Sequence, residues 1–343
     1  MGEWMSVMTH EVPAPAGPVT TGRRSKIIDI VKGLAITLVT YGHTAQGLHN
    51  RAWWTTSKFL FSNAFIYSFH MPVFFFVSGL FVMHSLGRRG VRSFTVEKLK
   101  TILYPYFLWA FIYVLLDPLM AQFRAGKHPF HGKEFLIQLI EGDYSWFLFT
   151  LFMCLMLAVL TRKLPAWLRF GLAVALGMLT PVTVVFGTVA HEFCFLAAGM
   201  WVGSSIEAID RLQSGMAALG LGAIALFQTA MIYRFGFTNV WDYVLLGLTG
   251  TLGLFFLARL IDPTKIGDLF AWIGRASLGV FLIAAFAQGA AREVLARGFH
   301  TQNFWVQLLI PTVVSTLVPA WIWYYQEQLH VGWLFHWPSR KKA

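Results

Sequence analysis

The chain has 343 residues, of which 57% are hydrophobic and only 13% are charged, and its mean hydropathy is +0.60. A soluble domain carries about 25% charged residues because its surface needs polar cover. The 32 phenylalanines and 14 tryptophans are typical of chains whose aromatic rings anchor helices at the faces of a bilayer. The composition therefore predicts a polytopic membrane protein embedded in a lipid bilayer. It excludes a soluble enzyme, a nucleic-acid reader and a disordered scaffold.

The formal net charge of +11 does not call for a nucleic-acid partner. Lys and Arg gather in the cytoplasmic loops of membrane proteins and set their topology. The two cysteines, Cys154 and Cys194, both lie in apolar segments. They indicate neither a disulfide framework nor a metal site.

Three regions are expected along the chain. Residues 1–25 contain no continuous apolar run and are rich in Pro and Ala over 12–18, which predicts a flexible cytoplasmic tail and not a signal peptide. Residues 26–330 are predicted to form a single membrane domain, and residues 331–343 a basic cytoplasmic C-terminal tail. No internal repeat and no separate soluble domain is evident.

Apolar runs of about 20 residues predict transmembrane helices. Backbone groups in hydrocarbon must hydrogen-bond within their own segment, so the expected fold is an all-α bundle of about ten helices. In chain order the candidates are residues 27–48, 60–82, 102–120, 146–160, 168–179, 189–206, 216–233, 240–260, 269–286 and 304–325.

The loop charges predict an orientation for this bundle. With the N-terminal tail in the cytoplasm, the loops on that side hold 17 Lys and Arg, against eight on the outer side. Such a bias favours both termini inside and an even number of crossings.

The first span contains Lys32 and His43, with ten residues between them. An α-helix has about 3.6 residues per turn, so both side chains lie on one helix face, about 16 Å apart along the axis. Ionisable residues inside a bilayer are expensive and usually functional. The alternative is that Lys32 extends to the interface and that His43 hydrogen-bonds a neighbouring carbonyl.

The second span places His70 just before Pro72. Counted from the outer face, His70 lies about 15 Å down, and counted from the inner face, His43 lies about 24 Å up. In a hydrocarbon core about 30 Å thick, the two imidazoles are therefore expected at similar depth.

Residues 28–36, the triplet at 42–44 and the run 69–79 together resemble the acyltransferase-3 family of integral membrane acyltransferases, most closely its fucose 4-O-acetylase-like branch. The hallmark of that family is a basic residue, ten intervening residues and a histidine in the first helix, which Lys32 and His43 match. Further similarities lie at residues 104–106, 146–148, 195–203 and 273–278, so the resemblance covers residues 26 to about 290.

The chain departs from the family pattern at two places. Residues 97–101 keep basic character without the spacing of the family's paired arginines, and Ala284 stands where many members carry a further histidine.

The resemblance implies transfer of an acyl group, usually acetyl, from cytoplasmic acyl-CoA to a hydroxyl of an envelope or exported glycan, in a bacterial inner membrane. This transfer needs a base that works near neutral pH, which histidine supplies. We expect His43 to act as that base or to carry the acyl group itself, and His70 to orient it or to polarise the thioester carbonyl. From the sequence these roles are interchangeable.

Basic side chains on the cytoplasmic side are candidates to bind the phosphates of acetyl-CoA, although they also serve as a topology signal. They are Lys32, Arg88, Arg89, Lys98, Lys100 and Arg275. At the outer face, Glu141 and Asp143 are candidates to contact a sugar, and Trp146 to stack on its ring. No set of His, Cys and carboxylate residues has metal-ligand spacing, so no metal is expected.

Two other functions remain open. A transporter or exporter of a glycan or small solute would fit a bundle with buried charges, although the duplicated halves common among transporters are not evident. An acyltransferase with a lipid or other non-sugar acceptor fits equally well. The sequence leaves the acyl chain length and the oligomeric state undetermined.

Overall fold

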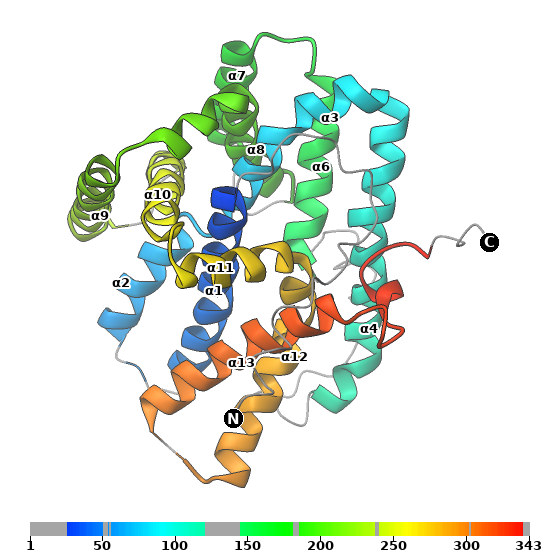
Figure 1. Cartoon of the computed structure of the whole chain (residues 1–343), viewed down its shortest axis with the longest axis vertical. Coiled ribbons are helices and arrows are strands. Elements are labelled where there is room, and N and C mark those ends of the chain that lie inside the picture. Colours follow the sequence, from blue (N-terminus) through cyan, green and yellow to red (C-terminus); the bar gives the residue numbers. More distant parts are fainter. Residues whose placement is uncertain are drawn as a thin grey trace.

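The computed structural model describes residues 26–50, 54, 56–120, 145–180, 185–236, 240–301 and 303–338. Within them every regular element is a helix and no strand occurs, which confirms the all-α prediction for this part of the chain (Figure 1). The elements are α1 Lys26–His49, α2 Thr56–Tyr67, α3 Pro72–Lys98, η1 Leu99–Leu103, α4 Tyr104–Met120, α6 Trp146–Leu160, α7 Ala166–Leu179, α8 Val185–Val202, η3 Gly203–Arg211, α9 Ser214–Phe235, α10 Val240–Ile261, α11 Lys265–Arg275, α12 Ser277–Glu293, η4 Val294–Gly298, α13 Phe304–Tyr324 and η5 Gly332–Leu334.

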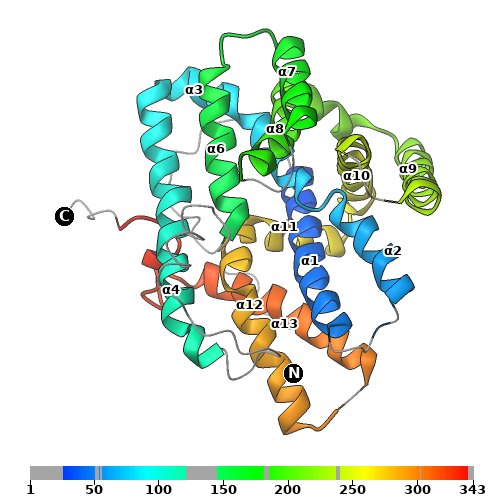
Figure 2. The ribbon, with the colours of Figure 1, turned by 180° about the vertical axis from the view of Figure 1, so that it is seen from behind.

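Helix α1 lies in the middle of the bundle in both views (Figures 1 and 2). It packs against α2, α3, α10, α11, α12 and α13. Ile30, Val31 and Ala35 are fully buried by these neighbours. Its apolar side chains gain stability from this burial, because they are removed from contact with solvent on several sides of the helix. The polar side chains of α1 are therefore positioned by the interior of the bundle.

Two of the predicted spans are broken helices. The predicted span 60–82 is interrupted by a turn at residues 68–71, and α3 begins at Pro72. Proline lacks an N–H group, so it starts a helix more easily than it continues one. The predicted span 269–286 is interrupted at Ala276, where α11 ends and α12 begins. In Figure 1, α11 lies across the bundle whereas α12 runs down it.

Helix α3 continues well past the end predicted for the second span and bends sharply at Gly90, whose backbone has φ 72° and ψ 163°. Side chains with a Cβ atom avoid this region, so the bend depends on glycine. Beyond it the chain turns back through η1 into α4, at the top of Figure 1.

Five helical stretches of the described chain are long and apolar enough to cross a bilayer, or six if the pair 187–202 and 205–211, bent by 72°, is one span. They are Phe59–Leu116, Ser214–Phe235, Asp242–Ile261, Ser277–Gly298 and Phe304–Tyr324. Apolar helices α6 and α7 are shorter than a full span. The ten predicted spans are therefore recovered only in part by this criterion.

Helices α3 and α8 approach closely through Gly79 and Gly199. A Cβ atom on Gly199 would lie 3.1 Å from the Gly79 Cα atom and would overlap the backbone carbonyl of Phe76. Gly203 lies four residues further along the chain, but nothing lies within 4 Å of a Cβ atom there. The partner of Gly199 is therefore Gly79, on another helix.

We expect Gly199→Ala to lower the free energy of unfolding by about 1–3 kcal/mol, because a backbone carbonyl cannot rotate away from the added methyl group. Gly222→Ala in α9 is the matched control, since a Cβ atom there meets nothing within 4 Å. The control should leave stability unchanged or raise it by up to about 1 kcal/mol, through better helix propensity. Thermal unfolding in detergent measures both, and equal midpoints would contradict the close contact.

Candidate active site

His43 lies in the second half of α1, and its side chain is accessible to solvent. Many protein atoms nevertheless lie around it, as expected for a residue of the central helix. The structure thus places the imidazole of α1 where a small substrate can reach it.

His70 lies in the turn between α2 and α3 and is buried. It is close enough to His43 for a charge on one ring to act on the other. Its Nδ1 atom lies 2.9 Å from the carbonyl oxygen of Ile66. Since a carbonyl only accepts hydrogen bonds, Nδ1 carries the proton, and Nε2 of the neutral ring is an acceptor. This geometry favours an orienting role for His70 over donation to a thioester carbonyl.

Tyr67, at the end of α2, completes this side of the site. Its ring meets His70 edge-on, with centroids 4.5 Å apart. A Cβ atom on Gly42 would lie 3.2 Å from the Tyr67 hydroxyl, so this glycine makes room for the tyrosine next to His43. Sequence reasoning missed Tyr67, although its position three residues before His70 places it in the same segment.

On its other side, α1 meets α12 and α13 through polar side chains. Thr44 accepts hydrogen bonds from the side chains of Gln288 and of Thr312, the latter at 3.2 Å. Thr40 bonds to Thr316 at 2.7 Å. Along the sequence Thr40 falls between Lys32 and His43, but the structure turns its hydroxyl towards α13.

Arg292 of α12 reaches the backbone of α1. Its Nη2 atom donates to the Thr44 carbonyl oxygen at 3.4 Å. Its guanidinium occupies the space that a side chain on Gly47 would fill, with Cζ 2.7 Å from the Cβ position. Arg292 is one of the eight charges that the sequence assigns to the outer loops, because the apolar run 269–286 ends before it. Only the helical continuation of α12 brings it to α1.

At the other end of α1, Lys32 and Arg275 meet at one carboxylate. Asp29 is 3% exposed, and its oxygens lie 3.4 Å from Lys32 Nζ and 3.9 Å from Arg275 Nη1. Tyr324 of α13 accepts a hydrogen bond from Arg275 Nε at 3.3 Å. Two predicted cofactor-binding residues are thus brought together by Asp29, which sequence reasoning did not include.

Lys26 begins α1 close to this cluster but has different partners. Its Nζ atom lies 2.8 Å from Asp268 and 3.3 Å from Asp262. The ion pairs fix the start of α1 to the beginning of α11 and to the turn before it.

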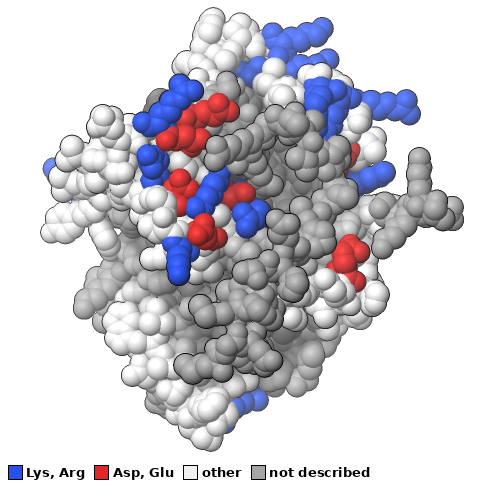
Figure 3. Space-filling model, in the orientation of Figure 1, with Lys and Arg blue, Asp and Glu red and all other residues white. Residues whose placement is uncertain are grey.

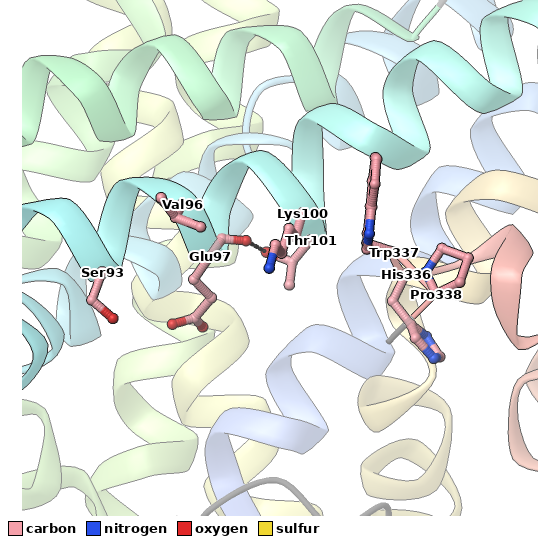
Figure 4. Close-up of a pocket in the computed structure, with 8 residues that line it drawn as sticks. All are labelled: Ser93, Val96, Glu97, Lys100, Thr101, His336, Trp337 and Pro338. Atoms are coloured by element: carbon pink, nitrogen blue, oxygen red, sulfur yellow. Dashed lines mark hydrogen bonds between the residues drawn. The ribbon is translucent and has the colours of Figure 1, made fainter. Parts of the chain in front are cut away.

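The other four predicted cofactor-binding residues form a second group around the bend of α3. Arg89 and Lys98 both form ion pairs with Glu97, and the Lys98 Nζ atom lies 3.8 Å from its carboxylate. Arg88 is exposed. Lys100 lines an open groove of about 710 Å³. The remaining lining residues are Ser93, Val96, Glu97, Thr101, His336, Trp337 and Pro338 (Figure 4).

The C-terminal segment forms one wall of this groove. Trp337 packs edge-on against Tyr104, with ring centroids 5.2 Å apart. Trp109 of α4 donates to the Leu334 carbonyl oxygen at 2.8 Å. In Figure 4, His336 and Trp337 lie across the groove from Glu97 and Lys100.

The charged side chains are unevenly spread over the face shown in Figure 3. Lys and Arg gather over the upper half, whereas the lower half, where α12 and α13 lie, shows few described charges. Asp and Glu lie among these cations at the left of the same half, so this end of the face carries charges of both signs.

The remaining predicted residues fall elsewhere. Glu141 and Asp143 lie outside the described residues. Trp146 begins α6 and is 38% exposed. Glu192, which is not among the predicted residues, is buried in α8 and accepts a hydrogen bond from Tyr243 of α10. In the part of the chain that the structure describes, no three His, Cys, Asp or Glu residues are placed to hold a metal ion.

Residues 25–324 match the model of a family described as an acyltransferase domain, Acyl_transf_3. The chain belongs to the acyltransferase-3 family. The matched region runs from α1 to α13 and includes His43, His70, Lys32 and Arg275, but not the C-terminal wall of the groove. Together with the apolar helices, this membership supports an integral membrane acyltransferase.

Two curated relatives share part of the chain. The nodulation protein NolL of Mesorhizobium japonicum is 28% identical over 176 residues, which are 49% of this chain and 44% of the relative. The nodulation protein NolL of Sinorhizobium fredii is 25% identical over 202 residues, 57% of this chain and 54% of the relative. The aligned part thus spans about half of each relative. No solved structure matches the chain significantly.

Proposed function

We propose that this acyltransferase moves an acetyl group from cytoplasmic acetyl-CoA to a hydroxyl of an envelope or exported glycan, in a bacterial inner membrane. The observation that supports the proposal is His43, accessible on the central helix and within electrostatic reach of His70, to which we assign the orienting role. Lys32 and Arg275 supply cations about three helical turns away, towards the other end of α1.

In the proposed reaction His43 is the general base. It takes the proton of the acceptor hydroxyl while the oxygen attacks the thioester carbonyl carbon. A C–O bond forms, and the carbonyl oxygen takes up the negative charge of the tetrahedral intermediate. When the C–S bond breaks, the thiolate of coenzyme A receives the proton from His43. The products are the acetyl ester and free coenzyme A, and no metal takes part.

The donor enters, in this proposal, from the end that carries Lys32. Guanidinium and ammonium groups bind phosphates through charge-assisted hydrogen bonds. If this end of α1 lies in the cytoplasm and the chain crosses the membrane an even number of times, both termini lie in the cytoplasm. The pantetheine arm then reaches along α1 to His43, so donor and acceptor enter from opposite faces of the membrane. Arg88, Arg89, Lys98 and Lys100 would attract the anionic donor to the same side, and Glu141, Asp143 and Trp146 would contact the sugar.

The proposal is tested with the purified protein in detergent, acetyl-CoA labelled in the acetyl group, and a glycan extract of the producing cells. We expect release of the coenzyme A thiol and label in the glycan fraction. Label in a lipid fraction would instead identify a non-sugar acceptor. A transporter would release no thiol and would leave the extract unlabelled. It would instead move a glycan across the membrane of proteoliposomes.

A further inference from the structure

Arg292 has no part in the mechanism above, yet it lies beside the proposed base. Gly47 is four residues after His43, so the two positions share one face of α1, with Cβ positions about 6 Å apart. The guanidinium occupies the Cβ position of Gly47 and is anchored to the Thr44 carbonyl oxygen. A permanent cation therefore stands one helical turn from His43.

The location of this cation is fixed by α1 itself. A methyl group at Gly47 would overlap the guanidinium, so the absence of a side chain there is what admits Arg292. The neighbouring Gln288 side chain bonds to Thr44, on the same turn of α1. Arg292 is half-buried, so part of its side chain remains accessible.

The reaction needs a donor at this place. Attack on a thioester puts a full negative charge on the carbonyl oxygen, and fixed donors aimed at that charge are usually the largest single contribution to such catalysis. His70 is poorly suited, because its Nδ1 proton is directed at Ile66. A guanidinium has five N–H donors and remains charged in proteins.

We propose that Arg292 is a catalytic residue that stabilises the oxyanion formed when the thioester carbonyl is attacked next to His43. The guanidinium donates hydrogen bonds to the carbonyl oxygen and keeps its own protons throughout. This inference rests on the proposed acetyl transfer, and it adds the group that meets the developing charge.

The test measures two reactions of acetyl-CoA: transfer to the glycan extract, and hydrolysis, in which water is the acceptor. Arg292→Gln should lower kcat for both by about 100- to 1,000-fold, as expected for loss of an oxyanion donor. The kcat of Arg292→Lys should lie between those of the wild type and Arg292→Gln, because an ammonium group keeps the charge but lacks the planar fork of donors. Added guanidinium at millimolar concentration should partly restore the activity of Arg292→Ala. A purely structural role for Arg292 predicts no such rescue.

Gly47→Ala supplies a second variant that keeps the charge but displaces it. A shift of the guanidinium by about 1 Å is enough to lower kcat up to about 100-fold. The double variant Gly47→Ala with Arg292→Gln should be no slower than Arg292→Gln alone, since both changes remove one interaction. Arg297→Gln is the control, because Arg297 is exposed and pairs with Glu293 at 2.8 Å.

Several outcomes would overturn the proposal. Unchanged hydrolysis in folded Arg292→Gln protein, with a raised KM for the glycan alone, would make Arg292 a contact for an anionic acceptor. If the losses in kcat of the two single variants add in the double variant, Gly47 and Arg292 do not act through one interaction. Full activity of Arg292→Gln with an inactive His43→Ala would reject only the oxyanion role, whereas full activity of both would also reject the proposed mechanism.

Discussion

Replacing His43 with alanine is expected to lower kcat for acetyl transfer by about 100- to 10,000-fold, the range that a positioned general base contributes. No other described imidazole is both accessible and placed next to Tyr67, His70 and Arg292. The KM for acetyl-CoA should change little, because the proposed phosphate contacts lie at the other end of α1. Release of coenzyme A thiol, followed with the purified protein, gives both constants.

His84→Gln is the matched control for this substitution, since His84 is an exposed histidine on α3. It should retain the wild-type kcat. A folded His43→Ala protein that turns over acetyl-CoA at the wild-type rate would refute the assignment of the base.

Replacing Lys32 with methionine is expected to raise the KM for acetyl-CoA by about 10- to 150-fold. Loss of a hydrogen bond to a charged group amounts to about 1.5–3 kcal/mol, and about 1.4 kcal/mol is a factor of ten in affinity. The methionine keeps most of the apolar stem, so packing beside Asp29 is largely preserved. kcat should fall much less than KM rises.

Lys26→Met is the control that distinguishes loss of a direct phosphate contact from loss of one positive charge at this end of the molecule. Lys26 lies on the same helix and end of the molecule, but it pairs with Asp262 and Asp268. Its substitution should leave the KM for acetyl-CoA nearly unchanged. A raised KM in Lys100→Met together with a normal KM in Lys32→Met would contradict the assignment, and would move the phosphates to the groove beside α3.

Helical spacing and composition account for much of this arrangement in advance. The ten residues between Lys32 and His43 define a common face of one helix, and counting depth along two antiparallel spans predicts that His43 and His70 lie near one another. Both inferences depend only on helix geometry. The structure brings the two histidines within electrostatic reach.

The partners that complete each end of α1 depend on tertiary packing and could not be read from local patterns. Asp29 joins Lys32 to Arg275, which lies 246 residues further along the chain, because α11 crosses α1. Arg292 falls beyond the predicted span 269–286, so the sequence pattern places it in an outer loop, whereas the helix continues past it to Gly298. The break before Pro72 was partly readable from the proline itself, but the break at Ala276 carries no comparable signal.

The most direct test of the account is a structure, by cryo-electron microscopy, of the protein with a thioether analogue of acetyl-CoA that cannot transfer its acyl group. The account predicts phosphates at Lys32 and Arg275, the pantetheine arm along α1, and the acyl carbonyl between His43 and Arg292. An acyl group on the far side of the bundle from His43 would contradict it.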